Sequence, residues 1–205
     1  MLPSVTHVAQ LSAAGFDLVH AFDAHAIANA ESGWAQLADG PRLGLLIGNT
    51  RALWPAFMAA RASLAGEPHP MQAYTERTLA RVFPAARIAY SHARYDGAFL
   101  PFQRLAIATG LGALAPSHLV IHPIYGPWFA LRAAVAIEGD PPARTPIAVP
   151  CACEAGCRTA LERAQADGTW QAWAGVREAC SLRSHRYSDE QIAYHYTHAW
   201  PSVRE

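Results

Sequence analysis

The run PRLGLLIGN, residues 41–49, is the stretch that most constrains the fold of this chain. A short apolar run without polar alternation is typical of a strand buried on both faces, so we expect a central strand at 43–48. Two further strand-like stretches, HLVIHP at 118–123 and PWFALRAAVAI at 127–137, are joined through IYG. We predict that all three strands lie in one central sheet.

Strands and helices are interspersed along the rest of the chain. Further strands are expected at 16–22 and 86–92, and helices at 4–15, 23–30, 50–66, 71–83, 99–112, 157–168 and 188–199. Thr50 and Ser188 are the expected N-caps of two of these helices. The order indicates an α+β fold with a mostly antiparallel central sheet flanked by helices.

The length of 205 residues is enough for one sizeable core, so we expect a single domain over 1–205. A proline-rich strap at 138–150 leads into a cysteine-containing segment at 151–180, which also holds a tryptophan-containing stretch. No repeat and no low-complexity segment is present.

The charge pattern and hydropathy exclude several classes of protein. The formal net charge is zero, which provides no electrostatic footprint for nucleic acid. Every basic residue is arginine, so a bound anion would be held by guanidinium, backbone or histidine. Neither a signal peptide nor a membrane span is recognised, and we expect a cytoplasmic protein whose cysteines are thiols, metal ligands or redox groups.

The segment HPIYGPW, 122–128, is the first candidate site. The proline after His122 keeps that histidine out of helical backbone space. Gly126 permits a backbone geometry or a close approach that a side chain would block. Tyr125 and Trp128 offer flat apolar faces that suit a flat ligand. The alternative is a plain hairpin with a hydrogen-bonded histidine and two core aromatics.

The cysteines are the second candidate site. Three lie within seven residues and one follows later: Cys151, Cys153, Cys157 and Cys180. Thiolates at such spacing can converge on a soft metal, as in zinc or iron–sulfur sites. The C-x-C-x3-C spacing matches neither a zinc knuckle nor a ferredoxin run, so ordinary thiols or an oxidised pair are the alternative.

Two histidines and two arginines complete the candidates. His195 and His198 share a helix face, as in a metal half-site, although a solvated or capping pair shows the same spacing. Arg132 lies inside an apolar strand, where a charge needs a partner, and Arg158 begins a helix after the cysteines. Either arginine could bind a carboxylate or phosphate, or form an internal salt bridge.

Several of these segments resemble one known family. IHPIYGPWFALRAAVAI is similar to the HPxxG-containing segment of the cobalamin C (cblC) family, the cyanocobalamin decyanase/dealkylase-type cobalamin-processing proteins. RTALERA followed by RYSDEQIAYHY, the strand and helix of RLGLLIGNTRALWPAFMAA, and PFQRLAIATGLGAL resemble other family segments in the same order. The resemblance spans nearly the whole chain.

The resemblance implies a flavin-reductase/nitroreductase-like fold and removal of the upper axial ligand of cobalamin. Cyanide would be lost by reductive decyanation with electrons from reduced flavin, and alkyl groups by transfer to the glutathione thiolate. By carry-over, the residues that line or shape the cobalamin pocket are His122, Tyr125, Gly126 and Trp128. Arg158 matches an arginine associated with the glutathione carboxylates. The partners implied are a corrinoid and a reductase, for a monomer or homodimer.

Two departures from the family pattern bear on these expectations. Pro127 replaces the second glycine of the motif, which removes a backbone donor. The family members also lack CACEAGC, so this chain adds a thiolate cluster that indicates different reductant chemistry. The alternatives to an axial-ligand-removing enzyme are therefore a non-catalytic corrinoid carrier and a metal–thiolate redox protein on the same fold.

Overall fold

The computed structural model describes residues 5–37, 39–143, 151 and 156–201. Its helices are α1 (Val5–Ala13), α2 (Ala24–Ala30), α3 (Leu53–Ala59), α4 (Pro70–Val82), α5 (Phe102–Ala108), α6 (Gly156–Asp167), α7 (Trp170–Glu178) and α8 (Asp189–Thr197), with 3-10 turns η1 (Ser32–Leu37) and η2 (Arg61–Leu64). Its strands are β1 (Leu18–Asp23), β2 (Leu43–Asn49), β3 (Arg87–Tyr90), β4 (Arg94–Tyr95), β5 (Ala98–Phe99), β6 (Ala113–Leu114), β7 (Val120–Ile121) and β8 (Ala130–Ile137).

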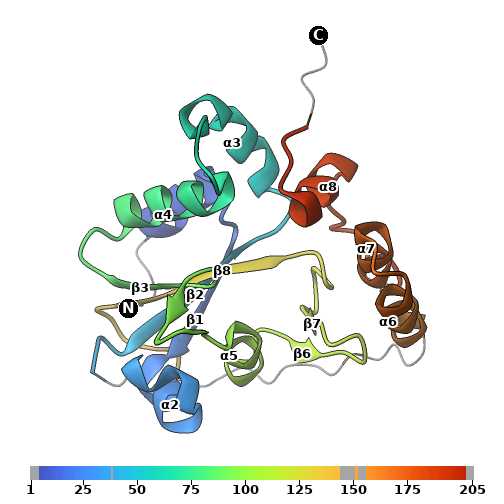
Figure 1. Cartoon of the computed structure of the whole chain (residues 1–205). Helices are drawn as coiled ribbons and strands as arrows, with labels where there is room; N and C mark the ends of the chain where they lie inside the picture. The colour runs from blue at the N-terminus through green and yellow to red at the C-terminus, as the bar shows by residue number, and fades with distance from the viewer. Residues whose placement is uncertain (1–4, 38, 144–150, 152–155, 202–205) are drawn as a thin grey trace.

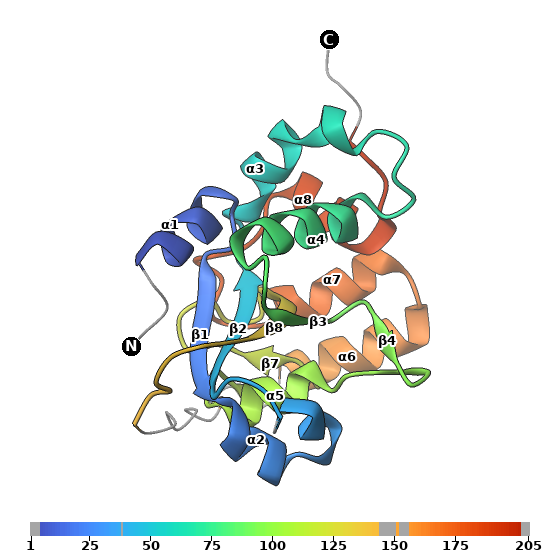
Figure 2. The same cartoon turned by 90° about the vertical axis from the view of Figure 1, so that its left-hand side faces the viewer.

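An antiparallel sheet in the order β1-β2-β8-β3 forms the centre of the molecule. Every residue of β2 is buried, as expected for a continuous apolar strand between two neighbours. Helices α1, α3 and α4 cover one face of the sheet, and α2 and α5 cover the other (Figures 1 and 2). The α+β class with a mostly antiparallel sheet flanked by helices is therefore confirmed.

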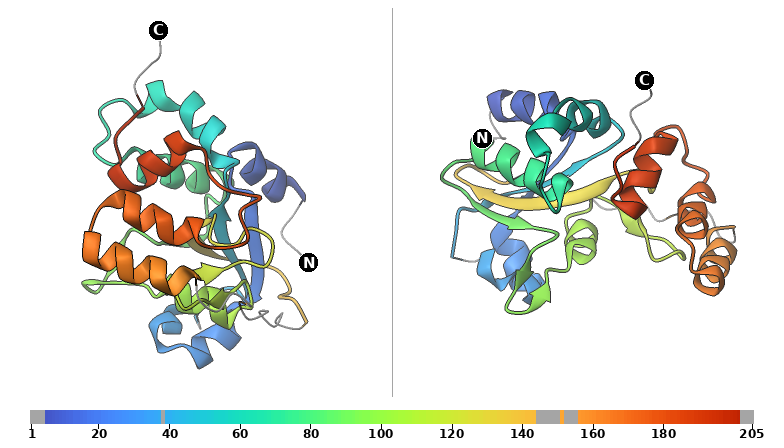
Figure 3. Two further views of the ribbon diagram at one scale, coloured as in Figure 1. Left: turned by 90° about the vertical axis from the view of Figure 1, so that its right-hand side faces the viewer. Right: turned by 45° about the horizontal axis from the view of Figure 1, so that its top comes forward.

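The C-terminal helices stand beside the sheet rather than on its centre. Helices α6 and α7 pack side by side, and α8 returns toward α3 and α4 (Figure 3). Ser188 caps α8 by accepting from the Gln191 N–H at 3.2 Å, as its position before two acidic residues predicts. No helix in the described part of the chain is long and apolar enough to cross a membrane.

The prediction that 118–123 is a strand of the central sheet is wrong. Only Val120 and Ile121 are in strand geometry, and they pair with β6 in a separate two-stranded sheet. His118 has a φ of 60°, which places a turn directly before the pair. After it, the backbone groups of His122 and Gly126 bond to each other across a turn, so the chain reverses here instead of continuing as a strand.

Two local predictions also differ from the structure. The helix expected from Thr50 begins at Leu53 instead. The Thr50 hydroxyl donates to Asp17 and accepts from the Ala52 N–H, in a turn that precedes the helix. The stretch after Gly168 is a full helix, α7, capped by Thr169, which accepts from the Ala172 N–H at 3.3 Å. A glycine followed by a threonine marks that start in the sequence.

Candidate functional site

A cavity of about 320 Å³ lies where α4, α8 and the ends of β3 and β8 meet. We call it the arginine cavity. Its walls come from segments far apart in the sequence: Trp54, Pro68, His69, Pro70, Met71, Gln72, Thr75, Ser91, His92, Arg132, Tyr187, Gln191, Tyr194, His195 and His198. Cavities of this size that combine an apolar wall with a few polar groups are typical small-molecule sites.

A β-bulge directs Arg132 into this cavity. Ile47 pairs with Ala133 and Gly48 pairs with Leu131, so Arg132 has no partner residue on β2. A bulged residue is turned away from the regular alternation of the strand. The Arg132 Nε donates to Asn49 Oδ1 at 2.7 Å, which fixes one edge of the guanidinium.

The charge of Arg132 is not neutralised by an acid in the described part of the chain, where no ion pair to its guanidinium is found. Burial lowers the pKa of Arg132, and the nearby charge of Arg177 lowers it further. An arginine nevertheless keeps its proton in proteins. Of the two sequence-based alternatives for this residue, an internal salt bridge is not formed with any acid in the described part of the chain.

Arg177 on α7 adds a second guanidinium beside the first. Its Nη1 donates to the carbonyl oxygens of Pro127 and Phe129, and its Nη2 lies 3.3 Å from His195 Nε2. Arginine can only donate, so Nε2 must accept and the His195 proton sits on Nδ1. Burial first, and then Arg177 and Arg132, lower the pKa of His195 to about 3. His195 is therefore neutral near pH 7.

Two buried polar atoms on the cavity wall have no hydrogen-bond partner within the described residues. They are the Tyr187 hydroxyl and the Gln191 Oε1, from residues that are 3% and 6% exposed. Burial raises the pKa of Tyr187 to about 12, so its hydroxyl is a donor. An unpaired buried polar group is costly, which indicates that a polar ligand or water completes this wall.

The HPIYG turn lies apart from the arginine cavity. His122 and Gly126 exchange backbone hydrogen bonds of 3.0 and 2.9 Å, and His122 Nδ1 accepts from the Ile124 and Tyr125 N–H groups. The Tyr125 ring stacks on His122 with centroids 4.5 Å apart and contributes to the core on the α2/α5 face. Burial, then His20 and His185, lower the pKa of His122 to about 4.

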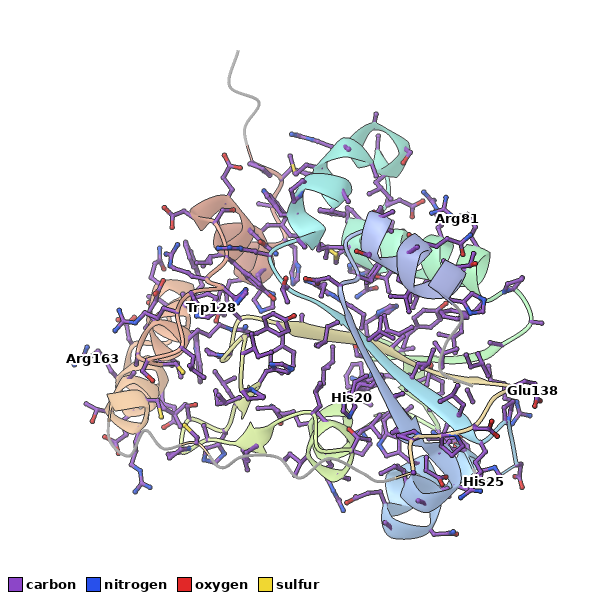
Figure 4. The ribbon with its side chains drawn as sticks, turned by 180° about the vertical axis from the view of Figure 1, so that it is seen from behind. His20, His25, Arg81, Trp128, Glu138 and Arg163 are labelled. Carbon is purple, nitrogen blue, oxygen red and sulfur yellow. The ribbon has the colours of Figure 1, made fainter. Side chains whose placement is uncertain are left out.

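Trp128 is fully buried and does not line the cavity. It sits between the sheet and the α6–α7 pair (Figure 4) and packs edge-on against Tyr187, with ring centroids 5.6 Å apart. Since Tyr187 does line the cavity, Trp128 supports the wall from behind. Gly126 has a φ of 58° and lies so close to Leu182 that a side chain would overlap it.

Three of the four cysteines meet at a second, much smaller cavity. Cys151, Cys157 and Cys180 line it together with apolar residues, and Cys157 and Cys180 are buried. Cys153 lies outside the described residues. Among the residues that are described, no group of three histidine, cysteine or acidic side chains is arranged to hold a metal ion. Arg158 is exposed on α6 and is not on the wall of either cavity.

Sequence patterns do not single out several residues on the wall of the arginine cavity or next to it. Tyr187 and Gln191 belong to the RYSDEQ motif, which is a usable signal for their position but does not indicate a role. Arg177 and Asn49 have no local signal, because only tertiary contacts bring them to Arg132. His195 and His198 do share the cavity wall, as their spacing suggested.

Comparisons with known proteins identify the fold. No protein-family model matches the chain, and no curated protein matches its sequence. The crystal structure of a C. elegans B12-trafficking protein CblC, described as a homologue of human MMACHC, is 19% identical. It superposes with a TM-score of 0.63 over 94% of this chain and 92% of that chain. The resemblance to the cobalamin C family indicated by the sequence motifs is thus confirmed at the level of the fold.

Proposed function

We propose that this protein binds a corrinoid with the lower base displaced from cobalt and removes its upper axial ligand. The observation that carries the proposal is the arginine cavity, in which Arg132 has no acidic partner among the described residues, on a chain with the fold of a B12-trafficking protein. The HPIYGPW and RYSDEQ motifs support the same assignment from the sequence.

Arg132 and Arg177 are the residues we assign to a thiol co-substrate such as glutathione. Guanidinium groups bind carboxylates in charge-assisted pairs, and nearby positive charge favours the thiolate form that attacks. Arg158 is the residue that the family resemblance points to, but it is exposed on α6 and away from the cavity. The carboxylate-binding role therefore fits Arg132, which lines the cavity, with Arg177 adding positive charge beside it.

The bond changes proposed are simple. In dealkylation the thiolate sulfur forms a bond to the alkyl carbon, the cobalt–carbon bond breaks, and its electron pair stays on cobalt. In decyanation an electron from a reduced flavin, supplied by a reductase partner, releases cyanide from cobalt. The chain contributes binding, orientation and charge, since the redox chemistry belongs to the corrinoid.

In this proposal the residues of the HPIYGPW segment have structural roles. Gly126 lets the turn lie against Leu182, and Trp128 packs behind Tyr187 on the cavity wall. His122 and Tyr125 stack on one another and present a partly buried aromatic surface on the other face of the sheet. We propose that Gly126 and Trp128 shape the ligand pocket, and that His122 and Tyr125, which lie away from the arginine cavity, keep the turn in place.

An anaerobic cobalamin titration tests the proposal. We expect micromolar protein to shift the spectrum of added methylcobalamin to the base-off form, and glutathione then to demethylate it. Arg132→Met should keep the spectral shift and lose the glutathione-dependent turnover. A spectrum unchanged by the wild-type protein would overturn the cofactor assignment, and a shift without turnover under any reductant would make the protein a corrinoid carrier.

The cysteines support a second candidate function, a metal–thiolate or thiol redox protein. The supporting observation is that Cys151, Cys157 and Cys180 line one cavity although they come from separate segments. Zinc or iron–sulfur would be the metal class, because thiolates are soft ligands. Metal analysis after anaerobic purification tests the metal-bound form: bound iron or zinc that is lost in Cys180→Ser supports it, and metal-free protein from supplemented medium contradicts it.

A further inference from the structure

Asn49, the last residue of β2, is fully buried beside the arginine cavity. Its side chain makes two hydrogen bonds: Nδ2 donates to the Thr50 carbonyl oxygen at 2.9 Å, and Oδ1 accepts from Arg132 Nε at 2.7 Å. The orientation of the amide is unambiguous, because a carbonyl can only accept and an arginine can only donate. Asn49 is therefore locked as a neutral acceptor facing a cation.

A carboxylate, Asp17, is bound to the residue that follows Asn49. Asp17 accepts from the Thr50 backbone N–H at 2.7 Å and from the Thr50 hydroxyl at 2.5 Å. Both of its oxygens thereby hold the backbone that carries Asn49, and neither is paired with Arg132. This series of contacts, from Asp17 through Thr50 and Asn49 to Arg132, holds the guanidinium in place without neutralising its charge.

This arrangement leaves the outer edge of the guanidinium for a ligand. Nε is bonded to Asn49, whereas no hydrogen bond from either Nη group to the described part of the chain is found. Arg132 lines the cavity, and the neighbouring Tyr187 hydroxyl also lacks a partner there. The two Nη groups of an arginine match the two oxygens of a carboxylate, which gives the bond its geometry.

We propose that Asn49 is a positioning residue that holds Arg132 at a fixed angle, and with its charge unpaired, for the carboxylate of the thiol co-substrate. The inference rests on the proposed function and adds a residue to which no motif in the sequence points. A neutral side chain is required at position 49, because an aspartate there would take the guanidinium as its own ion-pair partner.

Two variants separate positioning from a merely structural role. Asn49→Ala removes the acceptor for Arg132 Nε. Asn49→Asp keeps a near-identical shape and the acceptor oxygen but adds a charge that pairs with Arg132. If Asn49 has only a structural role, affinity for glutathione falls only in variants that fold poorly, so a folded Asn49→Asp binds glutathione normally. A positioning role predicts that Asn49→Asp loses affinity although it is folded.

The experiment is calorimetric titration of reduced glutathione into the protein without corrinoid, with folding checked by circular dichroism. We expect both variants to bind glutathione at least about tenfold more weakly than the wild type, equivalent to about 1.4 kcal/mol. Thr78→Val, a buried threonine on α4 outside the cavity wall, is the matched control and should bind normally. If Asn49→Ala does not fold, Asn49→Asp decides alone.

The outcomes also separate this inference from the proposed function. A folded Asn49→Asp with wild-type affinity, or a wild-type protein that does not bind glutathione, overturns the role of Asn49. If the wild type still shifts cobalamin to the base-off form in that case, the corrinoid assignment stands. If glutathione binding depends on Asn49 but no cobalamin shift occurs, the corrinoid assignment fails and the positioning role stands.

Discussion

Substituting Gly126 by alanine tests whether the HPIYG turn needs a glycine because of its backbone conformation and its close contact with Leu182. The backbone φ of Gly126 is 58°, in the left-handed region. A Cβ at this position would lie 2.5 Å from the Leu182 carbonyl oxygen and 2.7 Å from the Leu182 Cβ. Both distances are far inside van der Waals contact, and the obstructing carbonyl belongs to backbone, so the loop after α7 must move.

Two effects add up in this variant. The left-handed backbone conformation costs an alanine about 1–2 kcal/mol. The overlap with Leu182 adds about 1–3 kcal/mol, the usual range for overpacking. Reduced freedom of the unfolded chain offsets about 0.4–1 kcal/mol of this. We therefore expect Gly126→Ala to lower the free energy of unfolding by about 2–4 kcal/mol, as the balance of these values.

Gly97 provides the matched control. Its φ is 83°, but nothing lies within 4 Å of a Cβ placed there. Gly97→Ala therefore carries the backbone cost without the overlap and should lose only about 1 kcal/mol. Urea unfolding followed by circular dichroism at 25 °C measures both variants. Equal losses in the two would refute the argument that contact with Leu182, rather than backbone conformation, makes Gly126 necessary.

Three further predictions follow from burial and charge. The pKa of His195 is about 3 in the folded protein and about 6.5 in the unfolded chain. Its contribution to the free energy of unfolding is therefore complete above about pH 6.5 and is lost as the pH falls toward 3. This histidine contributes up to about 1.4 kcal/mol per pH unit, and His195→Gln should make the acid slope of unfolding free energies shallower by that amount; an unchanged slope contradicts the assignment. Trp128→Ala should cost about 3–5 kcal/mol in urea unfolding, since the whole indole is buried, and a loss below 1 kcal/mol would show that the ring is not core. Cys157 and Cys180 should react with a thiol reagent much more slowly in the native protein than in urea, and equal rates would show that their cavity is open.

Elements whose signals are local could be predicted from the sequence. The continuous apolar run of β2 specified a buried strand, and Ser188 before two acids specified the start of α8, because burial on both faces and helix capping act within a few residues. The clustering of Cys151 with Cys157 was also expected from their spacing, and both line one cavity. The family resemblance indicated the fold that the structural comparison then matched.

The arginine cavity was decided only by the tertiary structure. The sequence shows Arg132 as a charge in an apolar strand, but the direction of its side chain depends on a bulge opposite Ile47 and Gly48, which a single strand cannot reveal. Asn49 lies 83 residues from Arg132 in the chain, and Arg177 lies 45 residues from it (177 − 132). The short pairing of β7 with β6 likewise depends on which strand the folded chain places within hydrogen-bonding distance of β7. Sequence patterns report a residue's local conformation and burial, whereas a binding site depends on which distant side chains the packed sheet and helices bring within a few ångströms.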